Sequence, residues 1–467
     1  MRPVVEQAHA GARFGIGVDI GTSGCRAIVV GAQGKRLTEA QMPLPEPIRG
    51  FNGAVEQAPE LWWDAVLALL ARVAPAVAGR PGGRLCLDAT SATLLLARPD
   101  GTPLGPALMY SDSQSVDAAR RIASVAPATS AARGASSSLA KLLRLMSQYR
   151  PSGPVLALHQ ADWIIGRLAG RLTGSPAGRL ASRPRAQSAD SGADVVPAPG
   201  DSDWNNALKL GFDPASEAWP SWVLALLPEP VMLPEIHAPG APLAAIDRRI
   251  AEATGLPGDL MICAGTTDST AAVIATGANR PGDAVTSLGS TLVLKIVSER
   301  PVAAPDYGVY SHRLGERWLA GGASNSGGAV LRKWFSDEQI ERLMPQIDPN
   351  TDSGLDYYPL LTAGERFPIA DPELKPRLTP RPPSDAHFLH GLLEGIARIE
   401  RDGYRRLTKL GATAPQRVLT TGGGARNRQW QQMRQRLLGI PVLAAEHQDA
   451  AFGAAMLALH PAGWRTP

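Results

Sequence analysis

An aspartate, two glycines and two small hydroxyl residues stand close together in residues 19–26, which read DIGTSGCR. Glycines allow the backbone to approach an anion closely, and successive N–H groups can form a nest around phosphate oxygens. Thr22 and Ser23 add hydroxyl donors. Asp19 could hold Mg²⁺ through water, because Mg²⁺ prefers a carboxylate together with several waters. An ordinary hairpin turn that Asp19 merely caps is the alternative interpretation.

A second aspartate stands where a predicted strand gives way to a predicted helix, in residues 265–270 (GTTDST). The dipole of that helix favours a negative charge at its start, which keeps Asp268 ionised at neutral pH. An ionised carboxylate can accept the proton of a hydroxyl group while the hydroxyl oxygen attacks a phosphorus atom. The alternative is an aspartate that only caps the helix.

Three adjacent glycines form the third segment of interest, residues 421–427 (TGGGARN), after a predicted strand at 417–419. They permit close backbone contact with a flat ligand or a phosphate, with a helix N-terminus alongside. Asn427 and Trp430 could flank a purine. A tight turn with Trp430 packed in the core is the alternative. The glycines cost conformational entropy without adding packing, which favours a binding role.

The elements that must position these segments follow an α/β pattern, because short apolar runs alternate with longer helical stretches. Strands at 14–19 and 25–30 form a predicted hairpin around the first segment. A second predicted hairpin, at 284–297, has the similar tip SLGST at 287–291. We therefore expect two related halves, each offering one phosphate-binding hairpin to a shared cleft.

Composition along the chain suggests where the halves meet. Residues 239–247 are rich in proline and alanine, and a new α/β series begins after them. We accordingly predict an N-terminal domain at 1–245 and a C-terminal domain at 246–467. Residues 184–200 are rich in Pro, Ser, Ala, Asp and Gly, which predicts an inserted surface loop.

Bulk composition limits the class of protein. Of the 467 residues, 44% are hydrophobic and 19% are charged, which is typical of a globular protein. The net charge of +4 is dispersed and aromatic residues are few, so we expect no nucleic-acid partner. The most apolar helical stretch is shorter than the roughly 20 residues that span a bilayer, so we expect no membrane segment. Three cysteines without a CxxC pair predict reduced, buried thiols in a cytoplasmic protein.

Familiar phosphate and metal motifs are missing from the sequence. It contains no Walker A loop and no GxGxxG loop with the downstream residues of a protein kinase. It also shows no set of histidines, cysteines and acids at metal-ligand spacing.

Taken in order and at these separations, the three segments resemble the FGGY carbohydrate kinases of the actin/hexokinase/Hsp70-like superfamily. Further matching segments are VEQAPELWW at 55–63, MYSD at 109–112, LGST at 288–291 and AFGAA at 451–455. The resemblance covers almost the whole chain. It implies a two-lobed α/β fold, ribonuclease H-like in each lobe, with a cleft between the lobes and a last helix that packs back on the first. It also implies ATP and Mg²⁺ as cofactors.

The resemblance also implies roles for individual residues. Asp268 would be the catalytic base, and Asp19 would hold Mg²⁺ through water. The sugar would contact Asp19, Ser91, Asp112 and Asp268. The implied ATP-binding residues are Thr22, Ser23, Gly289, Ser290, Gly423, Gly424, Asn427 and Trp430. The implied partners are a small sugar and ATP, with no nucleic acid and no membrane, for a monomer or homodimer.

The substrate expectation rests on one departure. Typical xylulokinases carry Gln-Met-His-Gly where this chain has DATSAT at 88–93. With the segments at 107–112, 136–141 and 203–209, this looks like the cyanobacterial and plant kinases related to xylulokinase, relative to which 184–200 is an insertion. That resemblance implies phosphorylation of D-ribulose, with D-xylulose as the alternative. A non-catalytic sugar or nucleotide sensor on the same fold is the alternative from another class.

Overall fold

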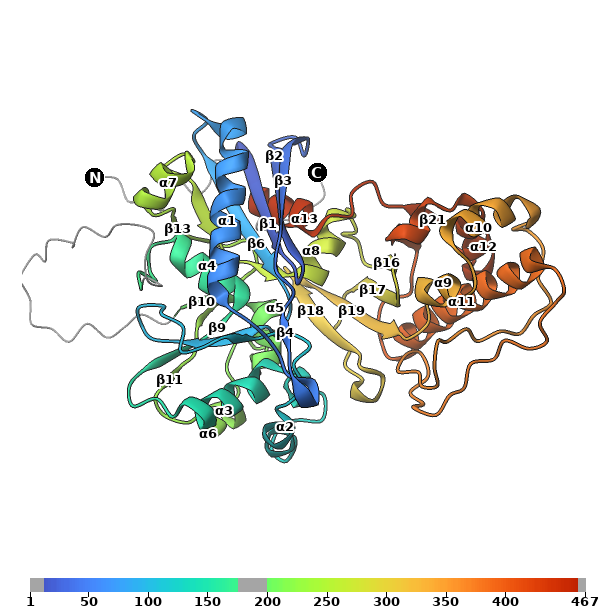
Figure 1. Cartoon of the computed structure of the whole chain (residues 1–467), viewed down its shortest axis with the longest axis horizontal. Helices are drawn as coiled ribbons and strands as arrows, with labels where there is room; N and C mark the ends of the chain where they lie inside the picture. The colour runs from blue at the N-terminus through green and yellow to red at the C-terminus, as the bar shows by residue number, and fades with distance from the viewer. Residues whose placement is uncertain (1–11, 175–199, 461–467) are drawn as a thin grey trace, which may run out of the picture. The chain divides into compact units, whose positions relative to one another are not determined.

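The computed structural model describes residues 12–174 and 200–460, which form two compact units (Figure 1). Unit 1 comprises residues 12–127, 132–174, 200–269 and 454–460, and unit 2 comprises residues 128–131 and 270–453. Of the predicted inserted loop at 184–200, all but Gly200 lies outside the described residues. Within the described residues, no helix has both the length and the apolar character needed to cross a bilayer.

The compact units change at residues 269 and 270, whereas the predicted domains change at 245 and 246. Two short strands that follow residue 246, β14 (Met261–Cys263) and β15 (Thr266–Thr267), pair with strand β6 (Gly83–Ala89) of unit 1. Composition along the chain contains no information about this pairing. The domain assignment to 1–245 and 246–467 stays a prediction.

Unit 1 is built on a seven-stranded mixed sheet. Its other strands are β1 (Phe14–Ile20), β2 (Gly24–Gly31), β3 (Arg36–Pro43) and β13 (Pro242–Ala245). The strand order is β13-β14-β6-β1-β2-β3, and β15 also pairs with β6. β1 runs antiparallel to β2 and parallel to β6. The hairpin predicted at 14–19 and 25–30 is therefore confirmed as β1 and β2.

Alternation along β1 separates the core from the candidate site. Ile16 and Val18 belong to an apolar core that includes the fully buried Trp62 of helix α1 (Pro59–Val73). Side chains alternate between the two faces of a strand, so Asp19 points to the face opposite Val18. Figure 1 shows α1 alongside β2 and β3, with which it is in contact.

Unit 1 also contains two smaller sheets and most of the shorter helices. The six-stranded sheet has the order β11-β9-β7-β8-β5-β4, and β10 pairs with β12. These strands are β4 (Ile48–Arg49), β5 (Val55–Gln57), β7 (Leu94–Ala97), β8 (Ala107–Leu108), β9 (Val155–His159), β10 (Asp201–Asp203), β11 (Val231–Met232) and β12 (Glu235–His237). The helices are α2 (Val116–Ala123), α3 (Ser138–Tyr149), α4 (Gln160–Leu168), α5 (Trp204–Ala207), α6 (Ser221–Leu226) and α7 (Arg248–Thr254), while α8 (Asp268–Ala275) and α13 (Ala450–Leu459) cross the unit boundary.

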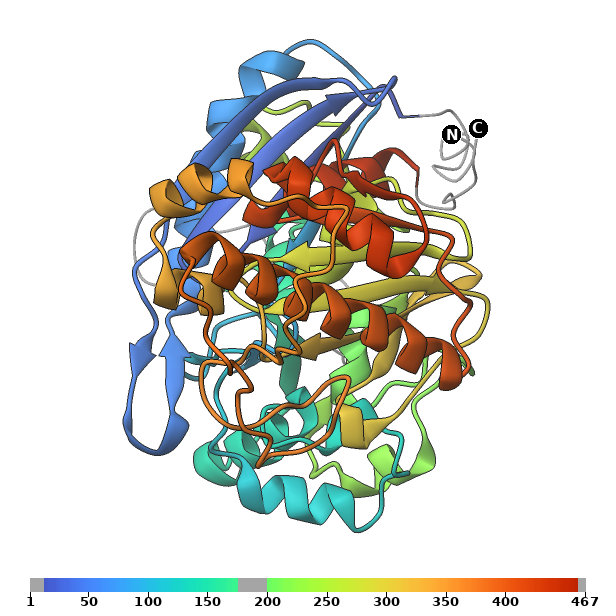
Figure 2. The same cartoon turned by 90° about the vertical axis from the view of Figure 1, so that its right-hand side faces the viewer.

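Unit 2 has a six-stranded sheet with the order β18-β19-β17-β16-β20-β21. Its strands are β16 (Asp283–Leu288), β17 (Leu292–Ser298), β18 (Tyr310–Leu314), β19 (Arg317–Ser324), β20 (Arg417–Thr421) and β21 (Val442–Ala444). Its helices are α9 (Gly328–Trp334), α10 (Asp337–Leu343), α11 (Asp385–Lys409) and α12 (Arg428–Leu438). Figure 2 shows α11 and α12 in front of the strands, and both helices contribute to the core of the unit.

The two main sheets share one plan. In each, a hairpin is followed by a third antiparallel strand on one side, and parallel strands lie on the other side. The hairpins are β1–β2 and β16–β17, and the parallel neighbours of their first strands are β6 and β20. The predicted pair of related α/β halves is thus confirmed. The cleft expected between them stays a prediction.

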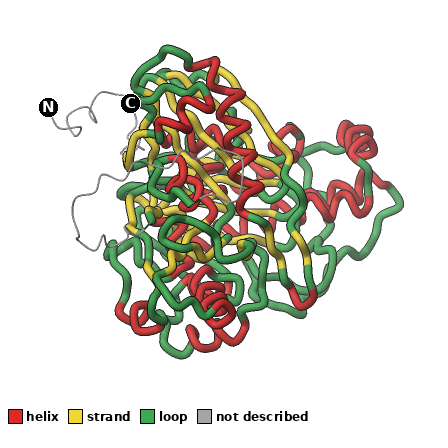
Figure 3. Tube along the Cα trace, turned by 60° about the vertical axis from the view of Figure 1, so that its left-hand side comes forward, coloured by secondary structure: helices red, strands yellow, loops and turns green. Residues whose placement is uncertain are grey.

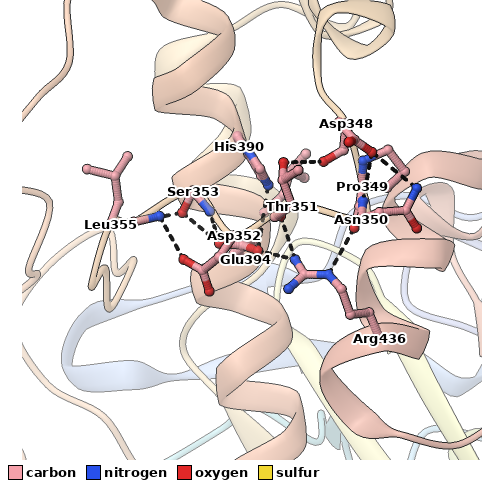
Figure 4. Close-up of polar contacts among 12 residues, drawn as sticks. Asp348, Pro349, Asn350, Thr351, Asp352, Ser353, Leu355, His390, Glu394 and Arg436 are labelled. Atoms are coloured by element: carbon pink, nitrogen blue, oxygen red, sulfur yellow. Dashed lines mark hydrogen bonds and ion pairs between the residues drawn. The ribbon is translucent and has the colours of Figure 1, made fainter.

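A long connection at residues 347–384 contains no helix and only isolated β-bridges (loops are green in Figure 3). Its start is held by the buried carboxylate of Glu394 on α11, which accepts hydrogen bonds from the backbone N–H and the hydroxyl of Ser353 at 2.9 and 2.6 Å. Arg436 of α12 also contacts Glu394 and donates to the carbonyl oxygens of Pro349 and Thr351 (Figure 4). Although burial alone raises it, the nearby imidazole of His390 and the hydrogen bonds from Ser353 and Arg436 lower the pKa of Glu394 to about 2.

Candidate active site

Three carboxylates of unit 1 stand at the C-terminal ends of neighbouring parallel strands. Asp19 is the penultimate residue of β1, and Asp88 is its direct partner on β6. On the other side of Asp88, Thr266 of β15 is its partner, and Asp268 follows two residues later. Because neighbouring strands are only about 4.8 Å apart, the three acidic side chains gather at one edge of the sheet.

Asp88 is the most buried of the three and was not selected as a site residue from the sequence. It is 0% exposed, and among the described residues neither of its carboxyl oxygens has a hydrogen-bond partner. Burial raises the pKa of Asp88 well above its ordinary value, and the neighbouring carboxylates of Asp19 and Asp268 raise it further. The register of β1, β6 and β15 thus brings Asp19, Asp88 and Asp268 to the same edge of the sheet.

Asp268 is the first residue of α8, as the sequence predicts. Its Oδ1 accepts a hydrogen bond of 2.6 Å from the backbone N–H of Ser269, and its side chain is half-buried. A negative charge at this position is stabilised by the helix dipole. The carboxylate is therefore partly accessible to solvent, as the carboxylate of a general base must be.

The other residues expected at the sugar have different surroundings. Ser91 follows Asp88 by three positions, and its buried hydroxyl has no partner among the described residues. Asp112 is fully buried, and its carboxylate accepts hydrogen bonds from the backbone N–H of Val55 at 3.0 Å and from Arg144 at 3.2 Å. Asp112 therefore joins two segments of the fold. The sugar contacts predicted for Ser91 and Asp112 stay predictions.

The tip of the β1–β2 hairpin carries Thr22 and Ser23. A backbone hydrogen bond of 3.0 Å from Gly21 to Gly24 closes the turn, and Ser23 is exposed. Both hydroxyls are thus presented at the end of the strand that carries Asp19. Their predicted role toward phosphate is consistent with this position and stays a prediction.

A buried polar network supports the segment that precedes Asp268. Asp203 caps α5 by accepting hydrogen bonds from the backbone N–H groups of Asn205 and Asn206 at 2.8 and 3.1 Å. The side chain of Asn205 then donates to the hydroxyl of Thr266 at 3.1 Å. Burial, together with the charge of Asp162, raises the pKa of Asp203 to about 7.

The raised pKa of Asp203 predicts a pH dependence of stability. Between about pH 4 and pH 7 the folded chain keeps a proton that the unfolded chain releases, so the free energy of unfolding falls as pH rises. We expect this single group to contribute a slope of about 1.4 kcal/mol per pH unit in that range. Asp203→Asn, which can still cap α5, should remove this part of the slope in urea unfolding at pH 5.0, 5.5 and 6.0.

The control for this prediction is Asp117→Asn, because Asp117 is an exposed aspartate on α2. It should leave the pH profile unchanged. An unchanged slope in Asp203→Asn would show that Asp203 is ionised in the folded protein at these pH values.

Unit 2 contains a pocket of about 750 Å³ that collects the predicted nucleotide-binding residues of this unit. The tip of the β16–β17 hairpin contributes Gly289 and Ser290, and the glycine segment contributes Gly423, Gly424 and Asn427. Apolar lining comes from Leu288, Leu331, Ile340, Met344, Leu393 and Trp430. The hairpin tip and the glycine segment are far apart in the sequence. The structure brings them together around one concave, partly apolar surface.

The three glycines after β20 differ in the space that surrounds them. Gly422 has φ = 82°, and a Cβ there would lie 2.6 Å from the carbonyl oxygen of Leu288. A Cβ on Gly424 would lie 2.7 Å from the ring of Trp430. Gly423 has open space where its Cβ would stand, and it lines the pocket. Two of the glycines therefore permit close packing, and the third leaves the pocket open.

Trp430 packs in the core and also lines the pocket, so both interpretations of this residue from the sequence fit its position. It is 3% exposed, and its indole N–H donates to the carbonyl oxygen of Leu393 at 3.1 Å, so it belongs to the core. It also lines the pocket. Asn427 caps α12 by accepting a hydrogen bond of 2.9 Å from the backbone N–H of Trp430. The start of α12 also lines the pocket.

Sequence reasoning also missed Arg332 on α9. Its guanidinium donates a hydrogen bond of 2.9 Å to the hydroxyl of Ser290 and lines the same pocket. An arginine at a serine- and glycine-lined hairpin tip suits the binding of anionic oxygens. No spacing in the sequence links residue 332 to residue 290, because the contact arises from the packing of α9 against the hairpin.

Comparison with known proteins agrees with this geometry. Residues 284–462 match the model of the C-terminal domain of the FGGY family of carbohydrate kinases. A xylulose kinase of Streptomyces coelicolor is 27% identical over 478 residues, covering 94% of this chain and 86% of that protein. A xylulose kinase of Bacillus subtilis is 29% identical over 229 residues, covering 46% of this chain and 45% of that protein.

A solved structure has the same fold over nearly the whole chain. The xylulose kinase of Rhodospirillum rubrum superimposes with a TM-score of 0.80 at 24% identity, covering 97% of this chain and 91% of that protein. Residues 284–462 thus match the C-terminal domain of the FGGY family of carbohydrate kinases, and most of the chain is similar to xylulose kinases in sequence and fold.

Proposed function

We propose that this kinase transfers the γ-phosphoryl group of ATP to a ketopentose, with D-xylulose as the first candidate substrate. The observation that carries the proposal is the pocket of unit 2, where the β16–β17 hairpin tip and the glycine segment after β20 meet. A partly apolar pocket suits a flat base, and glycine-lined backbone with Arg332 and Ser290 suits phosphate oxygens. The matched family consists of carbohydrate kinases, which supports a sugar as the acceptor.

In this proposal Asp268 is the general base. Its carboxylate accepts the proton of the sugar hydroxyl as the hydroxyl oxygen attacks the γ-phosphorus. Gly289, Ser290 and Gly423 position the nucleotide, Thr22 contacts the transferred phosphate, and Ser23 also binds ATP. Catalysis comes mainly from this positioning and from charge stabilisation, because phosphoryl transfer requires little covalent chemistry from the protein.

Unit 1 also has residues that fit the cation that kinases use with ATP. Asp19 offers a carboxylate at a strand end, next to the buried carboxyl group of Asp88, whose oxygens have no hydrogen-bond donor among the described residues. Asp19 would hold Mg²⁺, directly or through water. The cation, when bound, supplies positive charge against the phosphate oxygens. Asp268 keeps its role as proton acceptor.

The choice of ketose rests on two observations that point in different directions. The relatives compared above are named xylulose kinases, which favours D-xylulose over the D-ribulose expected from the sequence. D-Ribulose remains the second candidate, because residues 88–93 place small hydroxyl side chains such as Ser91 where typical xylulokinases carry Met and His. These two sugars differ in the configuration of one hydroxyl group.

A panel of acceptors tests the proposal. ADP release is measured by a coupled assay with D-xylulose, D-ribulose, L-ribulose, glycerol and D-glucose, and kcat/KM is compared. We expect a ketopentose to give the highest value, with D-xylulose ahead of D-ribulose. Preference for glycerol or D-glucose would refute the substrate class. No sugar-dependent ADP release with any acceptor would instead favour a non-catalytic sensor.

The pocket itself predicts the effect of a side chain at Gly423. Gly423→Leu should leave the fold intact, because its Cβ enters open space, but the side chain then occupies volume that the nucleotide needs. We expect at least a tenfold rise in the KM for ATP, equivalent to about 1.4 kcal/mol of binding free energy, with little change in the KM for the sugar.

The matched control is Gly258→Leu, because Gly258 also has open space at its Cβ and lies in a loop of unit 1. Its kinetics should match the wild type. An unchanged KM for ATP in Gly423→Leu would place the nucleotide elsewhere.

A further inference from the structure

Asp88 is a fully buried carboxyl group to which the described residues offer no hydrogen-bond donor and no positive charge. It is 0% exposed, and among the described residues both of its oxygens lack a hydrogen-bond partner. No arginine, lysine or histidine of the described residues forms an ion pair with it. Buried carboxyl groups are normally hydrogen-bonded or paired, because burying an unpaired one is costly. Apart from its close contact with the carboxyl group of Asp19, which raises the pKa of Asp88, the fold supplies no partner for this group among the described residues.

Asp88 also lies between other residues of the candidate site. It lies on β6 between Asp19 on β1 and Thr266 on β15, and it is in register with both. Residues in register on neighbouring parallel strands point to the same face, about 4.8 Å apart. The charge of Asp268 also acts on Asp88. The orphaned oxygens are thus aimed into the edge of the sheet where two further carboxylates stand.

We propose that Asp88 is a ligand of the divalent cation and shares it with Asp19. Hard cations such as Mg²⁺ take oxygen ligands, and one or two carboxylates with several waters complete the usual shell. A cation between Asp19 and Asp88 gives the orphaned oxygens a partner and offsets the repulsion between the acids. Asp268 remains beside the pair as the base.

A second cluster in unit 1 offers three ligand atoms within 4.8 Å of one another, from Asp201, Glu235 and His237. The carboxylate of Asp201 is already held by Arg171 and by His237, the latter at 2.9 Å. The positive guanidinium of Arg171 would repel a cation there. The cluster therefore has a structural explanation, and it supplies a control.

The test measures cation binding without ATP or sugar. Mn²⁺ is titrated into the full chain, and free Mn²⁺ is followed by electron paramagnetic resonance. We expect Asp88→Asn to raise the Kd of the tightest site at least tenfold. Glu235→Gln, the same type of change at an exposed carboxylate of the second cluster, should leave that Kd unchanged.

A thermal measurement supports the same test. Mg²⁺ should raise the melting temperature of the wild type, because a ligand that binds only the folded state stabilises it. The rise should be lost in Asp88→Asn. Asp88→Ser, which is smaller and also neutral, should behave in the same way. It replaces Asp88→Asn in both measurements if Asp88→Asn does not fold.

Several outcomes overturn the proposal. One is an Mn²⁺ Kd for Asp88→Asn within twofold of the wild type. If the KM for the sugar rises while that Kd is unchanged, Asp88 contacts the acceptor instead. Loss of Mn²⁺ binding in Glu235→Gln places the cation at the second cluster. If neither variant of Asp88 folds without cation, its role is structural.

The inference rests on the proposed function only for the expectation that a divalent cation is used, and the two can fail separately. Unchanged Mn²⁺ binding in Asp88→Asn, alongside sugar-dependent ADP release by the wild type, removes the cation role and leaves the kinase function standing. The opposite case is that Mn²⁺ binding is lost in the variant while the wild type shows no sugar-dependent ADP release. That result supports Asp88 as a cation ligand and removes the kinase function.

Discussion

Replacing Asp268 by asparagine is expected to lower kcat for sugar phosphorylation about 10²–10⁴-fold, the usual contribution of a general base. Asparagine has nearly the same shape and can still accept the hydrogen bond from the backbone N–H of Ser269, but it cannot take up the proton of the sugar hydroxyl. Since the change removes an interaction of the transition state, kcat should fall far more than the affinity for ATP. Coupled ADP release at saturating ATP and ketose measures the effect.

The matched control is Asp247→Asn, because Asp247 also stands at the start of a helix and caps α7 through the backbone N–H of Arg249. Asparagine is an equally good cap, so activity and stability should change little. Near-normal turnover by Asp268→Asn, with the fold intact, would remove Asp268 from the role of base and require another acceptor for the proton.

The second large effect concerns the stability of unit 2. Arg434 and Glu400 form a fully buried ion pair, with two hydrogen bonds of 2.6 Å between guanidinium and carboxylate. Arg434 also donates to Thr420 on β20 at 2.8 Å, and Thr286 on β16 donates to Glu400 at 2.5 Å. The pair thus connects α11 and α12 to the two strands that lead to the pocket of unit 2.

We expect Arg434→Met to lower the free energy of unfolding by about 3–5 kcal/mol, because Glu400 then remains buried without its counter-charge. The transition of unit 2 in calorimetric melting of the full chain should move to a lower temperature. The KM for ATP should rise as well, since the strands lose their connection to α12.

Two further variants make the prediction specific. The double variant Arg434→Met with Glu400→Leu should recover much of the loss, because an apolar pair leaves no buried charge. Arg120→Met, which removes an exposed ion pair with Asp117, should cost less than about 1 kcal/mol. If Arg434→Met were as mild as Arg120→Met, Glu400 would have to be protonated or hydrated in the folded protein.

Much of the fold could be predicted from the sequence, because local patterns determine it. Apolar runs around glycine- and hydroxyl-rich tips predicted the β1–β2 and β16–β17 hairpins, and both are confirmed. The helix at Asp268 was predicted from the strand-to-helix change and is confirmed as α8. The relation between the two halves followed from the similar tips and is confirmed by the shared order of their main sheets.

The rest depends on contacts between distant segments, which a single sequence does not contain. Asp88 ends an apolar run like many strand-terminal residues, and only the register with Asp19 marks it as part of the site. Arg332 reaches Ser290 because α9 packs against the hairpin. The strands β14 and β15 join the sheet of unit 1 by pairing with β6. The composition of residues 239–247 contains no signal for this pairing.

The transfer of a labelled phosphoryl group tests the central claim most directly. The protein is incubated with ATP labelled with ³²P in the γ position, Mg²⁺ and D-xylulose or D-ribulose, and the products are separated by anion-exchange chromatography. We predict label in a pentulose phosphate with the wild type and almost none with Asp268→Asn. Label that remains in ATP, or that appears only in inorganic phosphate with every ketopentose, would contradict the account.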